Sequence, residues 1–189
     1  MTQENFDSLL NRIWVTRTAR INAEKRLIGK EEFCQFLNVY YSLITIFLSV
    51  VAFIEKNDTL SLLTIFMTIT LLVAILYLNS QQHLKQARDY RKNYTSLQQL
   101  EFRLKHISCT DDAEIRLLED EYCHLLDSSC NHCTFDYYCA LHDSRGLYKD
   151  PCWTGWIKAK YRWEIIWRIV LKAVLVVLPV FLYFQYGVI

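Results

Sequence analysis

The sequence contains very few residues that break helices. It has only four glycines and two prolines in 189 residues, and neither type occurs between Lys30 and Arg145. A sheet protein needs turn residues at about every eight to twelve positions, and this stretch does not supply them. We therefore expect an all-α protein.

Charged residues are missing from two long stretches. Residues 36–54 contain none in 19 positions, and residues 59–79 contain none in 21. As a helix, each stretch would be about 30 Å long, enough to cross the hydrocarbon core of a bilayer. Only residues 55–58 separate them, too few to form a folded element. We therefore predict a transmembrane hairpin over residues 36–79, with a loop at 55–58.

Basic residues flank the hairpin mainly on one side. Six Lys or Arg precede the first crossing and four closely follow the second, whereas the loop holds only Lys56. By the positive-inside rule, the N-terminus and the central region face the cytoplasm and the loop faces outward. The sequence opens on a charged amphipathic segment, so no cleavable signal is expected.

Helical spacing of apolar residues continues on both sides of the hairpin. Residues 1–35 are predicted to form a cytosolic amphipathic helix, either a solvated face with ion pairs or a surface for lipid headgroups or a partner. Apolar positions from Leu84 to Ile107 predict that the second crossing continues into the cytosol as one rod of roughly 70 Å. Its apolar stripe requires a partner: the N-terminal helix, a later helix or another copy of the rod.

The rest of the chain is expected to be helical too. Residues 80–164 are predicted to form a cytosolic helical region, which includes a short helix that starts after a break at 108–112 and ends near Ser128.

The tail, residues 165–189, is predicted to form a third transmembrane helix with the C-terminus outside. Its last 17 residues carry no charge, and four tryptophans lie just upstream. The alternatives are a helix in the interface, or an apolar helix kinked at Pro179 and buried against the hairpin.

Seven cysteines, an odd number, fit reduced cytosolic thiols better than a disulfide framework. Four residues are spaced as two pairs of zinc ligands: Cys130, Cys133, Cys139 and His142. The same segment is also typical of a helix with small buried thiols. We prefer the helix and predict neither a metal nor a cofactor.

Motifs of the common catalytic sites are lacking. We find no glycine-rich phosphate loop, no Gly-x-Ser-x-Gly and no His-Glu-x-x-His. We therefore expect no enzyme activity. We also predict no direct binding of nucleic acid.

Polar residues inside the hairpin recur at steps of three or four, which places them on one face of each helix. They are Asn38, Ser42, Thr45 and Ser49 on the first crossing, and Ser61, Thr64 and Thr68 on the second. Such a stripe either packs against another helix or lines a wet path in an assembly of several copies. Both interpretations stay open.

The order of these parts resembles the SLATT family, two-transmembrane effectors of prokaryotic conflict systems that are found beside SMODS nucleotide synthases and SLOG sensors. The matching motifs are Arg20-x2-Ala23-Glu24-Lys25-Arg26-Leu27, Tyr40-Tyr41-Ser42-Leu43-Ile44, Tyr94-x2-Leu97-x2-Leu100-Glu101 and Asn131-His132-x3-Asp136-Tyr137. The last motif includes none of the cysteines, which also turns the prediction away from zinc.

The resemblance implies a function. It implies an oligomeric effector of the prokaryotic inner membrane that forms a pore or disrupts the membrane after an upstream nucleotide or nucleic-acid-linked signal. The cell then stops growing or dies before a phage multiplies. The implied partners are membrane lipid, further copies of the chain, and a sensor encoded nearby, such as a nucleotide synthase or a reverse transcriptase. The alternative is a non-conducting membrane anchor that recruits a cytosolic partner through its rod.

Overall fold

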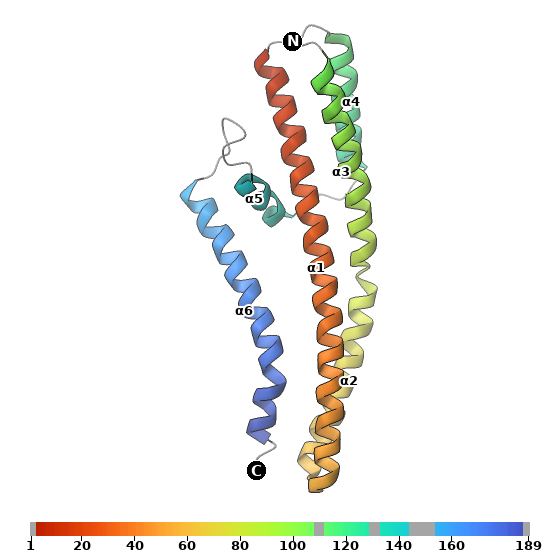
Figure 1. Ribbon diagram of the computed structural model, residues 1–189, viewed down its shortest axis with the longest axis vertical. Helices are drawn as coiled ribbons and strands as arrows, with labels where there is room; N and C mark the ends of the chain where they lie inside the picture. The colour runs from red at the N-terminus through yellow and green to blue at the C-terminus, as the bar shows by residue number, and fades with distance from the viewer. Residues whose placement is uncertain (1–2, 108–111, 129–132, 144–153, 187–189) are drawn as a thin grey trace. The chain divides into compact units, whose positions relative to one another are not determined.

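The protein is helical throughout the residues described by the computed structural model, which are 3–107, 112–128, 133–143 and 154–186. No strand occurs in these ranges, and the predicted all-α fold is confirmed (Figure 1). The helices are α1 (Gln3–Glu55), α2 (Asp58–Ser80), α3 (His83–His106), α4 (Asp112–Asp127), α5 (Thr134–Asp143) and α6 (Gly155–Tyr186).

The chain divides into two compact units. The first unit comprises Met1–Ile28 and Leu84–Glu164, and the second comprises Gly29–His83 and Ile165–Ile189. Helix α1 contributes to both units, because it runs without interruption across the division between Ile28 and Gly29. It also continues through the boundary that we predicted between residues 35 and 36.

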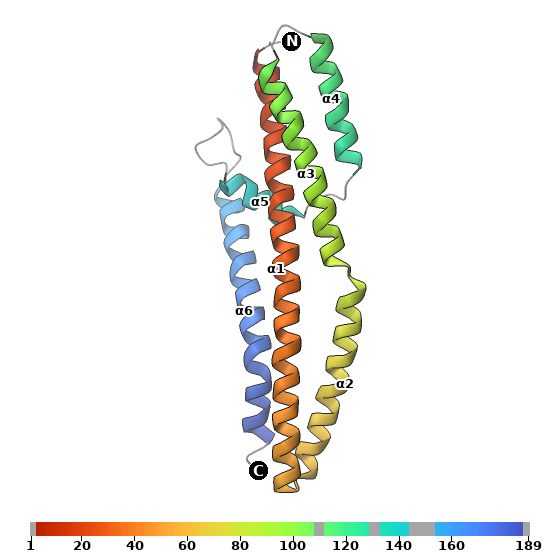
Figure 2. The same ribbon diagram turned by 45° about the vertical axis from the view of Figure 1, so that its right-hand side comes forward.

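The core of the first unit lies between the N-terminal part of α1, α3 and α4, which lie side by side in Figure 2. Each helix contributes three buried side chains at helical spacing: Phe6, Leu9 and Ile13 from α1, Leu97, Leu100 and Leu104 from α3, and Ile115, Leu118 and Tyr122 from α4. A smaller cluster joins Ala23 and Leu27 of α1 to Ala87 and Tyr90 of α3. The apolar stripe of α3 is thus covered by helices of the same chain. Of the three partners we considered, the N-terminal helix and a later helix are the ones observed.

The predicted rod is interrupted. Helix α2 ends at Ser80 and α3 begins at His83, and Gln82 between them has a φ of 48°. Residues other than glycine rarely adopt this left-handed conformation, and it cannot continue a right-handed helix. Our prediction of one continuous helix from residue 59 to 107 was therefore wrong at this point. Neither glycine nor proline occurs there, so the usual signals of a helix break are missing at this point.

The hairpin in the second unit turns more tightly than predicted. Helix α1 ends at Glu55 and α2 begins at Asp58, so only Lys56 and Asn57 connect them. Lys56 has a φ of 52°, and the Asn57 side chain accepts a hydrogen bond from the backbone N–H of Leu60 at 3.0 Å. This N-cap satisfies one of the free donors at the start of α2.

The two arms of the hairpin contact each other through a small apolar cluster. It consists of Leu48 and Ala52 of α1 and Leu60 of α2, with Ile44, Val51 and Leu63 packed around it. Most of the other large apolar side chains of both arms are exposed. Two stretches of the described helices, one in α1 and one in α2, are long and apolar enough to cross a membrane, and only 11% of each is buried. The core helix of a water-soluble protein is largely buried, so these surfaces suit contact with lipid.

In the second unit α6 packs along α1 in the parallel direction. The Lys172 ammonium lies 4.8 Å from the centroid of the Phe33 ring, and the next contacts further along α6 are made by Tyr40 and Tyr41. A third crossing beside the first one fits this direction, with the end of α6 on the side of the 55–58 turn. The crossing itself stays a prediction, because only stretches of α1 and α2 among the described helices are long and apolar enough to cross a membrane.

Candidate functional site

The polar residues of the Arg20–Leu27 motif hold the other helices of the first unit against α1. Three of them, Arg20, Glu24 and Arg26, each contact a different helix or helix end. Arg20 and Glu24 are buried and Arg26 is half-buried. We call Arg20, Glu24, Arg26 and their partners the α1 polar layer.

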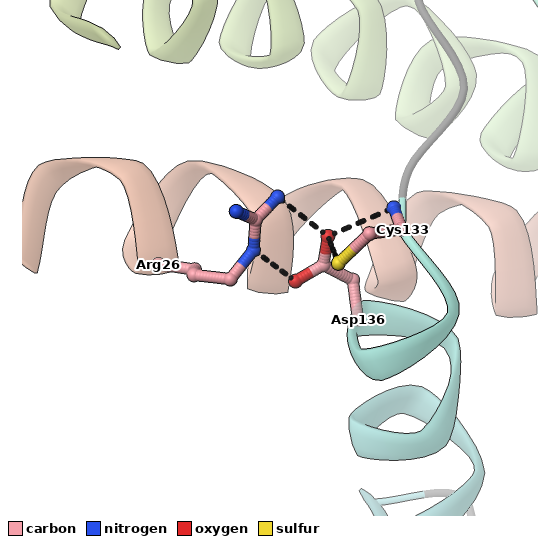
Figure 3. Close-up of polar contacts among 3 residues, drawn as sticks. All are labelled: Arg26, Cys133 and Asp136. Carbon is pink, nitrogen blue, oxygen red and sulfur yellow. Dashed lines mark hydrogen bonds and ion pairs between the residues drawn. The ribbon is translucent and has the colours of Figure 1, made fainter. Parts of the chain in front are cut away.

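Arg26 forms a bidentate ion pair with Asp136 of α5 (Figure 3). Its Nε donates to Oδ1 at 2.8 Å and its Nη2 to Oδ2 at 3.0 Å. The Asp136 side chain is completely buried, whereas 24% of the Arg26 side chain is exposed. The hydrogen bond to Asp136 is the main cause that raises the pKa of Arg26. Planar two-bond pairs of this kind fix orientation as well as charge.

The carboxylate of Asp136 also starts α5. Asp136 is the third residue of this helix, and its Oδ2 accepts from the backbone N–H of Cys133 at 3.2 Å and from the Cys133 thiol at 3.1 Å. This is the return half of a capping box, with Cys133 in the N-cap position. One buried carboxylate therefore both begins α5 and fastens it to α1.

Arg20 holds the C-terminal end of α4. Its Nη1 donates to the backbone carbonyl of Leu125 at 3.2 Å, and the Asn93 side chain of α3 donates to the same oxygen at 2.8 Å. The carbonyls in the last turn of a helix lack internal donors and carry partial negative charge, which suits a cation. Arg20 is fully buried, and its Nε and Nη2 have no hydrogen-bond partner in the described residues. Loss of solvation is the main cause that lowers its pKa.

Two further ion pairs connect α1 with α3. The Nε of Arg91 lies 2.6 Å from the buried Glu24 carboxylate. Two turns of α1 nearer the N-terminus, Arg17 lies 3.2 Å from Glu101, which also pairs with Lys105 at 2.7 Å. Arg17, Arg91 and Lys105 were not among our predicted site residues. The signal that could have identified them is a pair of opposite charges at matching positions of two amphipathic helices.

Not all of the motif residues take part. Lys25 is exposed, and Tyr137 is exposed with its ring beside that of Tyr138. Asn131, His132 and Cys130 lie outside the described residues. The structure thus brings together Arg20, Glu24, Arg26 and Asp136 from two motifs more than 100 residues apart in sequence.

The proposed zinc ligands that are described do not converge. Cys133 is a donor to Asp136, and the Nδ1 of His142 lies 3.4 Å from Asp143 of its own helix. Within the described ranges no group of three or more Cys, His, Asp or Glu could hold a metal ion. Residues 134–143 form a helix, as in the alternative that we preferred, but its thiols are not buried: Cys139 is half-buried, and Cys133, just before the helix, is exposed. Cys130 is not described, so the complete four-residue set stays untested.

We expect the Cys133 thiol to be unreactive. Partial burial, and then its hydrogen bond to Asp136, raise its pKa, because both disfavour a thiolate. A raised pKa leaves less thiolate at pH 8, so iodoacetamide should alkylate Cys133 more slowly in the folded protein than after unfolding in denaturant. Mass spectrometry of the peptide that contains Cys133 measures both rates. Faster reaction in the folded protein would contradict this geometry.

Five of the seven polar stripe residues of the hairpin hydrogen-bond to nearby backbone carbonyls. Ser42, Thr45, Ser61, Thr64 and Thr68 each donate to a backbone carbonyl three or four residues earlier, at 2.8–3.1 Å. Thr64 is buried, Ser49 and Thr68 are exposed, and Asn38, Ser42, Thr45 and Ser61 are half-buried. The contact between the arms is made by Leu48, Ala52 and Leu60. The first of our two interpretations was that the stripes pack against another helix. Hydrogen bonds from these hydroxyls across the hairpin are not seen in the described residues.

Two tyrosines of the first crossing bind backbone carbonyls of α6. Tyr41 Oη donates to the Leu175 carbonyl at 2.7 Å, and Tyr40 Oη donates to the Val176 carbonyl at 2.8 Å. Pro179 lies four residues after Leu175 and has no N–H, so the helix itself cannot satisfy the Leu175 carbonyl. Tyr41 replaces the missing donor. Two sequence signals could have predicted this hydrogen bond: a proline inside an apolar helix and a tyrosine on a neighbouring helix. We did not combine them.

Comparison with known proteins agrees with these features. The family model for the SMODS and SLOG-associating 2TM effector domain family 5 matches residues 2–185. Searches of curated proteins and of solved structures gave no significant match. The match covers both units and all six helices. The chain therefore belongs to this family of two-transmembrane membrane effectors of conflict systems.

Proposed function

We propose that the protein is a non-enzymatic effector of the prokaryotic inner membrane that assembles into a pore when an upstream signal reaches its cytosolic helices. In this proposal the first unit and the N-terminus face the cytoplasm. A sensor encoded nearby, such as a nucleotide synthase or a reverse transcriptase, supplies the signal. Loss of the membrane potential then arrests growth or kills the cell before a phage multiplies.

The observation that carries this proposal is that α1 belongs both to the polar layer and to the first membrane stretch. The same uninterrupted helix holds Arg20, Glu24 and Arg26 of the polar layer and continues to the end of the first membrane stretch. A change in how α4 or α5 binds to α1 therefore acts on a helix that enters the membrane. Packed helices with two discrete arrangements are the usual carriers of such coupling.

The hydroxyls of the hairpin suit a path for water and cations. Because each hydroxyl hydrogen is donated to a backbone carbonyl, the oxygen lone pairs are what a lumen would meet. In an assembly of several copies these oxygens would face one another across a shared channel. We propose homo-oligomerisation on this basis, with the copy number left to measurement.

One observation weakens the anchor alternative. A scaffold that recruits a partner through the apolar stripe of α3 needs that stripe to be free, but α1 and α4 cover it. Such a partner would have to displace a helix of the chain itself. The anchor alternative also predicts that polar-to-apolar changes in the hairpin have no effect.

The test is a pair of substitutions in the hairpin. Thr45→Leu with Thr68→Leu should abolish depolarisation in induced cells that contain the sensor, because the oxygens that line the path are lost while the helices gain apolar surface. Thr70→Leu is the matched control, since Thr70 is an exposed threonine of α2 with the same bond to its own backbone. A potential-sensitive dye gives the readout, and immunoblotting of membranes confirms equal protein. Depolarisation that persists in the double variant would exclude the stripes as a lumen.

A further inference from the structure

A groove of about 630 Å³ lies between α5 and the first turns of α6, within the first unit. Four of its eight lining residues are aromatic, and two are charged residues of α6. The residues that matter here are Phe135, Tyr138, Trp156, Lys160, Trp163 and Glu164.

The walls of the groove are held in place by ring stacking. Tyr161 of α6 stacks on Phe135 of α5 with centroids 6.0 Å apart, and on His142 of α5 at 5.1 Å. Helix α5 is also fastened through Asp136 to Arg26. A molecule in the groove would therefore contact α5, the helix that Arg26 of the α1 polar layer holds.

The charges of the groove form a dipole along α6. The Lys160 ammonium lies over the ring of Trp156, 5.4 Å from its centroid, and Glu164 follows four residues later. Residues four apart lie about 6 Å apart along a helix, on the same face. The groove thus presents one cation and one anion a helical turn apart, beside aromatic faces that themselves attract cations.

The position of the groove favours a lipid. Trp156 and Trp163 are 70% and 68% exposed, although tryptophan is usually buried in a protein surrounded by water. Further along, α6 enters the segment without charge that begins at Ala173. Trp163 lies ten residues before this segment, and tryptophans that flank a membrane segment are typical of the headgroup level of a bilayer.

We propose that this groove binds the headgroup of a phospholipid that carries a primary ammonium, of the phosphoethanolamine class. Lys160 binds the phosphate, and Glu164 accepts hydrogen bonds from the ammonium, which also lies against the face of Trp163. A carboxylate has about four acceptor sites, so other contacts of Glu164 are compatible with this role. A choline headgroup has no N–H to donate, and a glycerol headgroup has no cation. The proposal rests on the proposed function at the membrane and on the predicted third crossing by α6.

The experiment measures lipid retention by the full chain. The purified protein is delipidated in mild detergent and titrated with phosphatidylethanolamine, phosphatidylcholine or phosphatidylglycerol of equal acyl chains, and native mass spectrometry counts the bound lipid. We expect phosphatidylethanolamine to bind about tenfold more tightly than the other two, the gain typical of a charge-assisted hydrogen-bonded contact. Glu164→Gln should remove the preference over phosphatidylcholine, and Lys160→Gln should weaken all three lipids.

Lys158→Gln is the matched control, because Lys158 is an exposed lysine of the same helix that does not line the groove. Equal losses in Lys158→Gln and Lys160→Gln would mean unspecific attraction to a basic helix and would overturn the proposal. Tighter binding of phosphatidylglycerol would also overturn it, as would full displacement of the lipid by soluble phosphoethanolamine at equal concentration. If the protein retains phosphatidylethanolamine but never depolarises cells, the proposed pore is refuted and the proposed lipid site in the groove is still supported.

Discussion

Asp136→Asn is expected to destabilise the folded protein by about 3–5 kcal/mol, the range for breaking a buried ion pair from one side. The asparagine keeps the size of the side chain but leaves the half-buried Arg26 guanidinium without a counter-charge, and it weakens the cap of α5. Chemical denaturation in detergent, followed by circular dichroism, measures this loss. We also expect the variant to depolarise cells without any signal, because α5 is no longer fastened to α1.

A double variant tests whether the loss of stability comes from leaving one charge of the Arg26–Asp136 ion pair without its partner. Arg26→Met with Asp136→Leu removes both charges and replaces them with apolar side chains of similar size. Such replacements are often neutral or stabilising, so the stability lost with the ion pair should return, apart from about 1 kcal/mol for the lost cap of α5. Arg103→Gln is the control for a pair between α3 and α4 whose members are both largely exposed, and it should cost less than about 1 kcal/mol. Equal losses in Asp136→Asn and Arg103→Gln would contradict a special role for the buried pair.

Tyr41→Phe is expected to have the second-largest effect, about 1–3 kcal/mol, the penalty for a buried acceptor left without a donor. The Leu175 carbonyl then has neither the tyrosine hydroxyl nor a helical N–H, because Pro179 lacks one. In the predicted third crossing, water cannot replace the missing donor. Thermal unfolding of the detergent-solubilised protein should show the loss as a lower midpoint.

The proline provides an internal rescue for this prediction. In the background of Pro179→Ala, residue 179 regains its N–H and the Leu175 carbonyl can bond within α6, so Tyr41→Phe should then have little effect. Tyr40→Phe is the matched control, since its acceptor, the Val176 carbonyl, still has the N–H of Val180 four residues later. If Tyr41→Phe is equally harmful with alanine at residue 179, the hydroxyl does not serve the carbonyl freed by the proline.

The helices and the hairpin followed from the sequence because their causes are local. The lack of glycine and proline, and the two runs without charge, depend on no distant contact, and they predicted the end of α1 and the start of α2 to within one residue. The turn was predicted two residues too long, because helix ends depend on caps such as Asn57 that composition does not reveal.

The partners of each helix could not be predicted in the same way. The stripe of α3 fits a coiled coil with another copy as well as it fits α1 and α4, because all three arrangements use the same spacing. The break at Gln82 has no local signal at all.

Part of the α1 polar layer was predicted from the sequence, but only through the family resemblance. Arg20, Glu24, Arg26 and Asp136 were selected by resemblance to a family, without a physical account of what they do. Their pairing requires α5 to lie against α1, and residues 26 and 136 are too far apart in sequence for spacing to show this. Arg91 and Glu101 were missed as partners because exposed charges on amphipathic helices usually face solvent.

The most direct test of the proposed function is the membrane potential of cells that express the chain, with and without the genes encoded beside it. Our account predicts a stable potential with the wild-type chain alone and collapse within minutes once the signal is present. Asp136→Asn should collapse the potential in both cases, and Thr45→Leu with Thr68→Leu in neither. An unchanged potential under full induction with the signal present would contradict the account.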